Sequence, residues 1–137
     1  MEELLQKLNS LNKNTLMETL GIVFAYAKEG EVHATMPVDS RHHQPYGLLH
    51  GGASLALAET IGSVGSAMLV NPKEYLVVGL NMNCNHLKSV RSGMVTGVGK
   101  IIHQGRSTHI WDIVVKDDAE RVLSTFRFTN FVKPIEA

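Results

Sequence analysis

Glu59 is the only charged residue in the stretch of residues 51–70, which otherwise consists of apolar residues, Gly, Ser and Thr. An ionised carboxylate among apolar groups costs several kcal/mol unless it is paired or hydrogen-bonded, and no Lys or Arg in the stretch can pair with it. We therefore expect Glu59 to face a cleft as a nucleophile or general base; the alternative is a carboxylate that reaches the surface at a helix kink. Ser63 lies four residues later, on the same helix face. It could hydrogen-bond the carboxylate or a water, or simply let a sheet approach.

The start of the same stretch, His50-Gly51-Gly52, offers a second chemical group. The first N–H groups of a helix have no intrahelical partners, and the positive end of the helix dipole attracts anions. The two glycines would let a substrate oxygen come close to the backbone, as a polarised carbonyl or an oxyanion requires. A tight entry turn is the alternative explanation for the pair.

The spacing of these two groups has a geometric consequence. Gly51 and Glu59 are eight positions apart, which is about 12 Å along a helix axis. One carbonyl group therefore cannot contact both within one chain. If both act on the same atom, the donor comes from one subunit and the carboxylate from another. Two antiparallel helices about a two-fold axis would satisfy this, so we expect a homodimer with interfacial sites.

Hydrophobic periodicity predicts the elements in the N-terminal part of the chain. Leucines at helical spacing indicate an amphipathic helix over residues 2–12, followed by a short helical turn over 16–20. From Ile22 the period changes to two, which indicates a hairpin that ends at Pro37. We interpret residues 38–50 as a polar loop.

The rest of the chain predicts one long helix and a set of strands. Residues 51–70 are apolar on nearly all sides, which is typical of a buried helix or a membrane span, and the carboxylate within them makes the span costly. The remaining strands are expected over residues 76–84, 93–103, 107–116 and 122–132. In the first of these strands, one face should carry Leu76, Val78, Leu80, Met82 and Cys84. Short turns without intervening helices favour an antiparallel meander. The fold class is therefore α+β, with a long helix wrapped by a curved antiparallel sheet.

Composition and charge exclude several classes of protein. The chain has 137 residues, of which 44% are hydrophobic and 19% charged, as expected for one globular domain over residues 1–137, with 1–20 as a helical extension. Thirteen Lys and Arg balance thirteen Asp and Glu, whereas nucleic-acid binders usually have a basic excess. Cys84 is the only cysteine, so neither an intrachain disulfide nor a Cys-rich zinc site can form. The acidic N-terminus differs from a signal peptide, so we expect a cytoplasmic location and no membrane partner.

The segment Gln44-Pro45-Tyr46-Gly47-Leu48-Leu49-His50-Gly51-Gly52, followed by Ala58-Glu59, resembles the motif of the hotdog-fold acyl-CoA thioesterases. The similarity is greatest to the PaaI-like branch named for the Arthrobacter-type 4-hydroxybenzoyl-CoA thioesterase. Residues 36–41, 61–64 and 78–86 also resemble the bacterial 1,4-dihydroxy-2-naphthoyl-CoA thioesterases of menaquinone synthesis. The resemblance implies a hotdog fold, hydrolysis of an aromatic acyl-CoA without a cofactor, and a homodimer or homotetramer.

The resemblance also implies roles for individual residues. Glu59 would be the catalytic carboxylate, Gly51 the N–H group that polarises the thioester carbonyl, and Gln44 the amide beside the thioester. His50 would orient the loop, and Ser63 would assist the hydrolytic step.

Coenzyme A would be bound by a separate set of residues. His86 and Lys88 resemble a pair that contacts the coenzyme A tail, and Arg106 and Ser107 fall in a turn where the family often binds nucleotide phosphate. In this chain the order is Gly-Arg-Ser, whereas the nearest relatives are expected to have Gly-Ser-Arg. The sequence therefore differs from the family at the turn that would bind this phosphate. Because coenzyme A carries phosphates, Lys88, Arg91 and Arg106 should line the entrance as exposed cations; ordinary solvated charges are the alternative.

Other interpretations remain open at this point. A hotdog dehydratase or hydratase would use Glu59 and His50 together across the dimer to move a proton at carbon, and a non-catalytic acyl-CoA sensor would use the same groove. His42, His43 and His50 lie close in sequence and could suggest a metal site. However, no carboxylate or cysteine lies at a spacing that would complete the set of ligands. Thioester hydrolysis itself needs only charge stabilisation and a base or nucleophile, so we expect neither a metal nor a cofactor.

Overall fold

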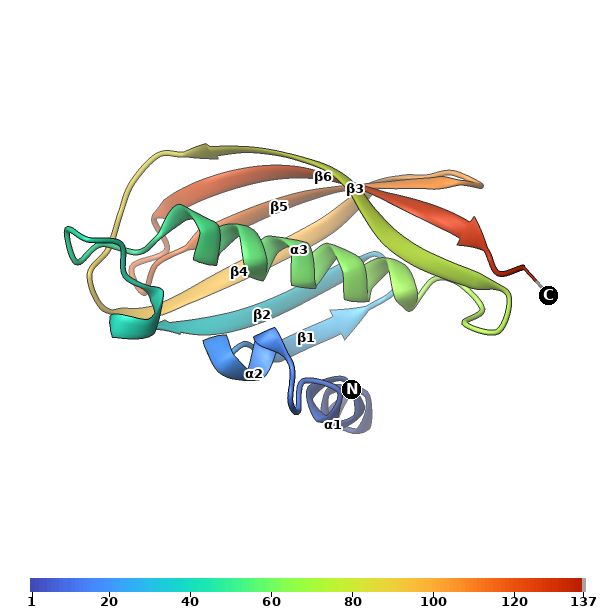
Figure 1. The fold of residues 1–137 in the computed structure, drawn as a ribbon, viewed down its shortest axis with the longest axis horizontal. Coiled ribbons are helices and arrows are strands. Elements are labelled where there is room, and N and C mark those ends of the chain that lie inside the picture. Colours follow the sequence, from blue (N-terminus) through green and yellow to red (C-terminus); the bar gives the residue numbers. More distant parts are fainter. Residues whose placement is uncertain (137) are drawn as a thin grey trace.

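A computed structural model of the protein describes residues 1–136 and shows one six-stranded antiparallel sheet with a long helix along one face (Figure 1). The elements in chain order are α1 (Glu2–Ser10), α2 (Leu16–Leu20), β1 (Val23–Lys28), β2 (Glu31–Val38), the 3₁₀ helix η1 (Ser40–His42), α3 (Gly51–Ala67), β3 (Tyr75–His86), β4 (Gly93–Gln104), β5 (Thr108–Lys116) and β6 (Val122–Pro134). The predicted fold class, α+β with one long helix against a curved antiparallel sheet, is confirmed. Among the described residues, no helix is long and apolar enough to cross a membrane.

The strand order differs from a simple meander. It is β1-β2-β4-β5-β6-β3, so β4, β5 and β6 form a meander, but β3 pairs with β6 and lies at the edge. The segment between β3 and β4 therefore crosses the end of the sheet instead of making a hairpin; there the N–H of Leu87 donates to the carbonyl of Leu123 at 2.7 Å. Periodicity predicts that strands exist but says nothing about which strands are neighbours.

Two strand predictions are corrected by local geometry. A register shift between Gly79 and Asn81 reverses the side-chain alternation. Met82 consequently packs on the core, whereas Leu76 and Val78 do not share its face and are exposed. Pro37 does not end its strand, because β2 continues to Val38. It lies beyond Thr35, the last residue paired with β1, where its missing N–H costs no bond on that side.

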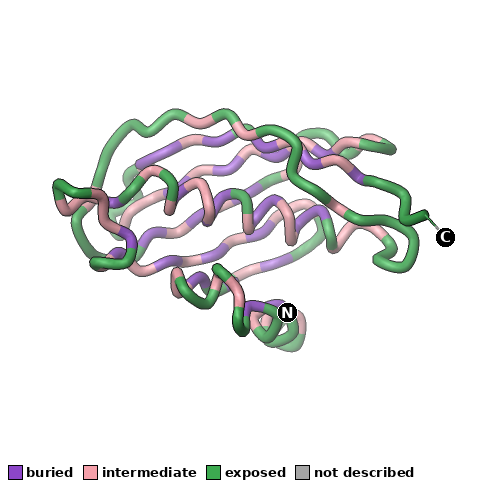
Figure 2. Tube along the Cα trace, in the orientation of Figure 1, coloured by how far each residue is buried: buried purple, intermediate pink, exposed green. Residues whose placement is uncertain are grey.

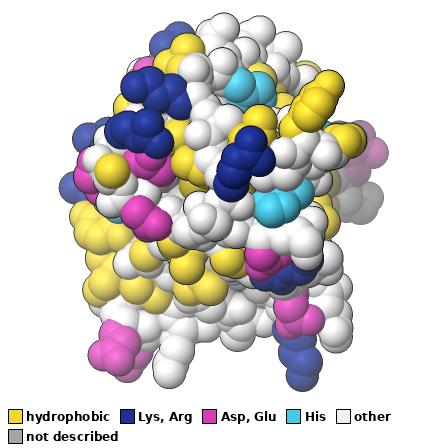
Figure 3. Space-filling model, turned by 90° about the vertical axis from the view of Figure 1, so that its left-hand side faces the viewer, with side chains coloured by type: hydrophobic (Ala, Val, Ile, Leu, Met, Phe, Trp, Pro, Cys, Tyr) yellow, Lys and Arg dark blue, Asp and Glu magenta, His cyan; other side chains and the backbone are white. Residues whose placement is uncertain are grey.

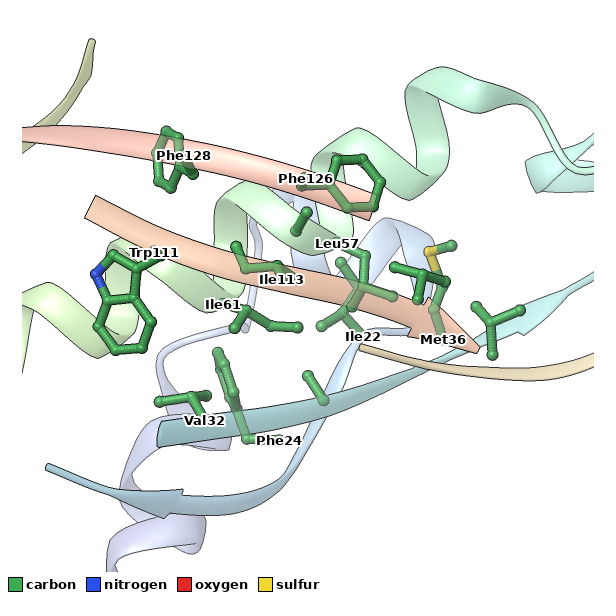
Figure 4. Close-up of a cluster of buried hydrophobic side chains, with 14 of the residues drawn as sticks. Ile22, Phe24, Val32, Met36, Leu57, Ile61, Trp111, Ile113, Phe126 and Phe128 are labelled. Carbon is green, nitrogen blue, oxygen red and sulfur yellow. The ribbon is translucent and has the colours of Figure 1, made fainter. Parts of the chain in front are cut away.

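The sheet-facing side of α3 packs closely because glycines line the contact. A Cβ atom on Gly62 would lie 2.4 Å from the ring of Phe128, and one on Gly65 would lie 2.4 Å from the ring of Trp111. From the opposite side, Ile61 fills the space above Gly97 in β4. Figure 4 shows Ile61 beside Ile113 and Trp111 in this core. The close approach fixes the height and rotation of α3 above the sheet.

A buried polar cluster fastens the C-terminal half of α3. Ser66 Oγ accepts hydrogen bonds from Trp111 Nε1 at 2.8 Å and from Asn130 Nδ2 at 3.0 Å. Its own proton is then left to donate to His109 Nδ1, 2.9 Å away. Burial lowers the pKa of His109, with a smaller contribution from the charge of His103. The lowered pKa and the Ser66 hydroxyl at Nδ1 both favour a neutral imidazole with its proton on Nε2.

The other side of α3 is not covered, contrary to the prediction of a helix buried all round. Gly52, Glu59 and Ala67 are exposed, and Figure 2 shows exposed and intermediate segments along the length of α3. Glu59 is therefore not a buried carboxylate within one chain. β3 is exposed along most of its length as well (Figure 2).

Helix α1 packs against β1, whereas α2 lies against α3. The amide of Asn9 accepts from the N–H of Phe24 at 2.8 Å and donates to the carbonyl of the same residue at 3.1 Å. Asn12 Nδ2 donates to the carbonyl of Ile22 at 3.0 Å. These side chains occupy backbone groups that a further strand would otherwise use.

Candidate active site

The loop before α3 is closed by its own hydrogen bonds. The N–H of Gln44 donates to the carbonyl of Leu48 at 2.8 Å, and the N–H of Gly47 donates to the carbonyl of Gln44 at 2.9 Å. Gly47 has a φ of 75°, a conformation that favours glycine. From outside the loop, Arg91 Nη1 donates to the carbonyl of Tyr46 at 2.9 Å. The loop is thus a folded unit rather than a loose connection.

The Gln44 side chain has one end occupied and one end free. Its Oε1 atom accepts the backbone N–H groups of Tyr46 and Leu48. Because N–H groups can bond only to the oxygen end of the amide, the Nε2 end is left to donate. Gln44 lines a cavity together with Gly51, so this donor lies beside the start of α3.

The first turn of α3 leaves one backbone N–H unused. His50 caps the helix: its Nδ1 accepts the N–H of Gly52 at 2.7 Å, and its carbonyl accepts the N–H groups of Ala53 and Ser54. Among residues 1–136, none accepts the N–H of Gly51. Gln44 Nε2 and this N–H border the same cavity, and two such donors beside a helix N-terminus could together bind a carbonyl oxygen. His50 caps this turn through its side chain; its predicted role of orienting the loop stays a prediction.

His86, at the end of β3, lies against this helix start. Its Nε2 atom is 2.7 Å from the position that a Cβ atom on Gly51 would take, and its Nδ1 atom is 2.7 Å from Ser124 Oγ in β6. The cavity between them has a volume of about 340 Å³, and Lys88 also lines it. Figure 3 shows this end of the molecule, with basic and histidine side chains over its upper part.

Glu59 and Ser63 lie in a different cavity. Its volume is about 270 Å³, and its walls come from α3 and from Leu16 and Met17 of α2. Glu59 Oε1 also lies 3.6 Å from the Cβ position of Gly79 in β3. The structure brings the carboxylate and the hydroxyl together, as the sequence predicts from their four-residue spacing.

The two cavities are separate within one chain. α3 runs unbroken from Gly51 to Ala67, so Gly51 and Glu59 are about 12 Å apart along its axis. One chain therefore cannot apply both groups to one carbonyl. The separation of Gly51 and Glu59 along one helix, from which the interfacial site was predicted, is therefore present in the structure.

The residues predicted to bind coenzyme A fall into two regions. His86 and Lys88 line the Gly51 cavity, and Arg91 supports the Gln44 loop. Arg106 and Ser107 lie in the turn between β4 and β5, a few residues before His109, which contacts the C-terminal end of α3. They are therefore at the opposite end of the sheet from Gly51. Within one chain the structure does not bring these two groups together.

The neighbouring histidines have other partners. His42 is buried; its Nδ1 accepts the N–H of Asp39 at 3.2 Å and its Nε2 donates to the carbonyl of Leu20 at 2.7 Å. His43 Nε2 donates to the carbonyl of Arg91 at 2.7 Å. In residues 1–136 no group of three or more His, Cys, Asp or Glu is arranged to hold a metal ion.

Sequence reasoning did not identify three residues of the two cavities. Ser124 holds His86, and Leu16 and Met17 face Glu59 across the second cavity. Nothing in the sequence signals these contacts, because they join residues 38 or more positions apart across different elements.

Comparison with known proteins gives a consistent result. Residues 46–124 match the Thioesterase superfamily. The chain is 44% identical to the proofreading thioesterase EntH of Klebsiella pneumoniae and 43% identical to the 1,4-dihydroxy-2-naphthoyl-CoA hydrolase of Escherichia coli; each alignment covers 93% of both chains. A crystal structure of a thioesterase variant from Pseudomonas aeruginosa superposes with a TM-score of 0.93 at 46% identity, covering 96% of this chain and 94% of the other.

Proposed function

The chain belongs to the thioesterase superfamily and is a thioester hydrolase with the hotdog fold, and on that premise we propose that it hydrolyses an aromatic acyl-CoA at sites shared by two subunits. The observation that supports this most strongly is the unused N–H of Gly51 beside the Gln44 amide. Two such donors stabilise the negative charge that develops on a thioester oxygen during attack.

Glu59 would supply the second half of the chemistry. As a general base it takes a proton from a water molecule while the water oxygen bonds to the carbonyl carbon; the C–S bond then breaks and the proton passes to the coenzyme A thiolate. As a nucleophile, the carboxylate itself forms the new C–O bond while the C–S bond breaks and the coenzyme A thiolate leaves; water then cleaves the anhydride, which releases the acid and restores the carboxylate, and the remaining proton passes to the thiolate. Ser63, in the same cavity, would hold the water in either route. Neither route needs a cofactor.

A homodimer would unite the two half-sites. The face of α3 that carries Glu59 is exposed, and the neighbouring edge strand β3 exposes Leu76, Val78 and Leu80. Exposed apolar side chains beside an exposed catalytic carboxylate are expected where a second copy packs. Gly51 and Gln44 of one subunit would then meet Glu59 and Ser63 of the other.

The proposed acyl group is 1,4-dihydroxy-2-naphthoyl, which would place the reaction in menaquinone synthesis. This choice is supported by the resemblance of residues 36–41, 61–64 and 78–86 and by the similarity to the Escherichia coli hydrolase. The coenzyme A portion would contact His86 and Lys88 at the Gly51 cavity. Arg106 and Ser107 would reach nucleotide phosphate only from a different subunit.

The test is thiol release from a panel of acyl-CoA thioesters: 1,4-dihydroxy-2-naphthoyl, benzoyl, 4-hydroxybenzoyl, phenylacetyl and straight-chain fatty acyl. We expect the fastest release with the naphthoyl or another aromatic thioester, and a loss of at least about 10³-fold in Glu59→Gln because the base or nucleophile is removed. Glu29→Gln, in the exposed turn between β1 and β2, is the matched control and should leave the rate unchanged.

Two results would contradict the proposal. Tight binding of acyl-CoA without thiol release by the wild type would favour a non-catalytic sensor. Conversion of an enoyl or 3-hydroxyacyl thioester without thiol release would favour a dehydratase or hydratase.

A further inference from the structure

The cavity that contains Glu59 has a wall from outside the matched family segment. One side consists of α3 residues, and the opposite side consists of Leu16 and Met17 of α2. These two residues lie about thirty positions before the segment that matches the superfamily, residues 46–124. The N-terminal extension therefore does more than cover the edge of the sheet: it completes the space in front of the carboxylate.

The chemistry of this cavity is divided between its two ends. The Thr60 hydroxyl donates to the carbonyl of Ala56 at 2.7 Å, so its proton is not available to a ligand. The polar groups that remain are the Glu59 carboxylate and the Ser63 hydroxyl, and the other lining side chains, including Val64, are apolar. A ligand that fits has a polar reacting end at Glu59 and an apolar body against α2.

The position of α2 is fixed by the segment that leads into the Gln44 loop. Arg41 Nη1 donates to the carbonyl of Thr19 at 2.8 Å, and His42 Nε2 donates to the carbonyl of Leu20 at 2.7 Å. Gly21, with a φ of 72°, ends the helix. The last carbonyls of α2 are thus capped by residues just before Gln44, so the wall and the oxyanion site are positioned by one connected segment.

Leu16 itself is in an unusual place for a leucine. It is 61% exposed although it lines a cavity beside a predicted catalytic residue. Met17 is half-buried next to it and packs on the core. A thioether and a branched alkyl group make a surface that suits a flat aromatic ring, because sulfur and aromatic groups attract one another and exposed apolar area is removed from water.

We propose that Leu16 and Met17 are specificity-determining residues that contact the acyl group and favour large aromatic acyl thioesters over short-chain ones. The inference rests on the proposed function, since it assigns a wall to that same site. A fused aromatic ring in this cavity offers more apolar surface to Leu16 and Met17 than a short acyl group does. The contribution of α2 to catalysis therefore increases with the size of the acyl group.

The test compares Leu16→Ala and Met17→Ala with the wild type on 1,4-dihydroxy-2-naphthoyl-CoA, benzoyl-CoA and butanoyl-CoA, with kcat and KM measured separately. The control is Leu11→Ala, because Leu11 is 63% exposed and belongs to the same extension but does not line the cavity. We expect kcat/KM for the naphthoyl thioester to fall about tenfold in each variant, less for benzoyl, and not for butanoyl. The control should match the wild type with all three substrates.

The possible failures can be told apart. If the wild type releases no thiol from any of the thioesters, the proposed function fails. If the wild type is active but both variants keep the wild-type ratio of naphthoyl to butanoyl kcat/KM, the assignment of α2 is overturned. Because Leu16 is exposed, its truncation does not open the core, so Leu16→Ala decides the question even if Met17→Ala folds poorly.

Discussion

His86 Nε2 lies 2.7 Å from the position that a Cβ atom on Gly51 would occupy. The imidazole is held there by Ser124 Oγ, 2.7 Å from its other nitrogen. The absence of a side chain at Gly51 is therefore what allows the ring to pack against the first turn of α3. Any larger residue must move either the ring or the helix start.

Gly51→Ala should lower thioester hydrolysis by about 10²-fold, because displacement of a site group by about 1 Å has effects of this size. Steady-state kinetics checks this, and circular dichroism should show an unchanged fold. The double variant Gly51→Ala/His86→Ala removes the ring that the new methyl group meets. The double variant should hydrolyse the thioester no more slowly than His86→Ala alone. A further large loss of activity would mean that the methyl group at position 51 acts through a contact other than the His86 ring.

Mixing two inactive variants tests the shared site. Gln44→Ala lacks the donor and Glu59→Gln lacks the carboxylate, so each homodimer is impaired at both sites. In a mixed dimer, one site receives both substitutions and the other receives none. After joint refolding at equal concentrations, about a quarter of the wild-type activity should return. If both residues acted within one chain, the mixture would stay as inactive as its components.

Arg91→Ala should weaken catalysis through the loop that it supports, since it loses the bond from Arg91 Nη1 to the carbonyl of Tyr46. A truncated thioester without the nucleotide, such as an N-acetylcysteamine ester, isolates this effect from phosphate binding. We expect kcat/KM to fall about tenfold with the truncated ester, and further with the coenzyme A ester if the guanidinium also meets phosphate. An unchanged rate with the truncated ester would contradict the role in the loop.

Gly65→Ala should destabilise the fold. The added methyl group would lie 2.4 Å from the ring of Trp111, which is fully buried and cannot move aside. Overpacking of this kind costs about 1–3 kcal/mol, and urea denaturation measures it. Gly52→Ala, at the exposed start of the same helix, meets only the imidazole of His50 and should change the free energy of unfolding by less than about 1 kcal/mol.

His109 should make stability depend on pH near neutrality. Its pKa is lowered from the ordinary value of 6.5 in the folded protein, so below pH 6.5 the unfolded chain binds a proton that the folded chain resists. The free energy of unfolding should therefore fall as the pH decreases through this value, by at most about 1.4 kcal/mol per pH unit. Asp39 and Asp117, whose pKa values are lowered, lose their contribution only in stronger acid.

Denaturation of the wild type and His109→Asn at pH 7.5 and pH 5.5 measures this difference. The asparagine oxygen can accept the Ser66 hydroxyl without binding a proton. The pH dependence in this interval should be smaller in the variant. Equal dependence in both proteins would mean that another group is responsible.

The parts of the fold that the sequence predicts are those set by local periodicity. The period of two in residues 22–36 and the apolar run after Gly51 correctly indicate a hairpin and a long helix. The predicted meander misplaced β3, which pairs with β6 at the edge of the sheet, because strand neighbours are decided by contacts between distant segments. The predicted faces of Leu76 and Val78 were also wrong, since one extra residue at the bulge reverses the alternation before Met82 and leaves no trace in composition.

The candidate site also has a part that local sequence could predict and a part that depends on contacts between distant segments. The distance between Gly51 and Glu59 follows from helix geometry alone. The sequence could therefore predict that one chain cannot bring both groups to the same carbonyl. The wall from α2 could not be foreseen, because it depends on hydrogen bonds from Arg41 and His42 to the end of that helix. The exposed side of α3 was not predicted, because a helix apolar on all sides can be covered by a second chain as well as by its own sheet.

The two margins of the sheet differ in how open their backbone groups are to a further strand. Along β1, the amides of Asn9 and Asn12 already bond to backbone groups of Phe24 and Ile22, so a strand added there would have to displace them. Among the described residues, no side chain bonds in this way to the backbone of β3 at the other margin. The asparagines of the N-terminal extension thus oppose edge-to-edge growth of the sheet along β1, the kind of growth that leads to fibres.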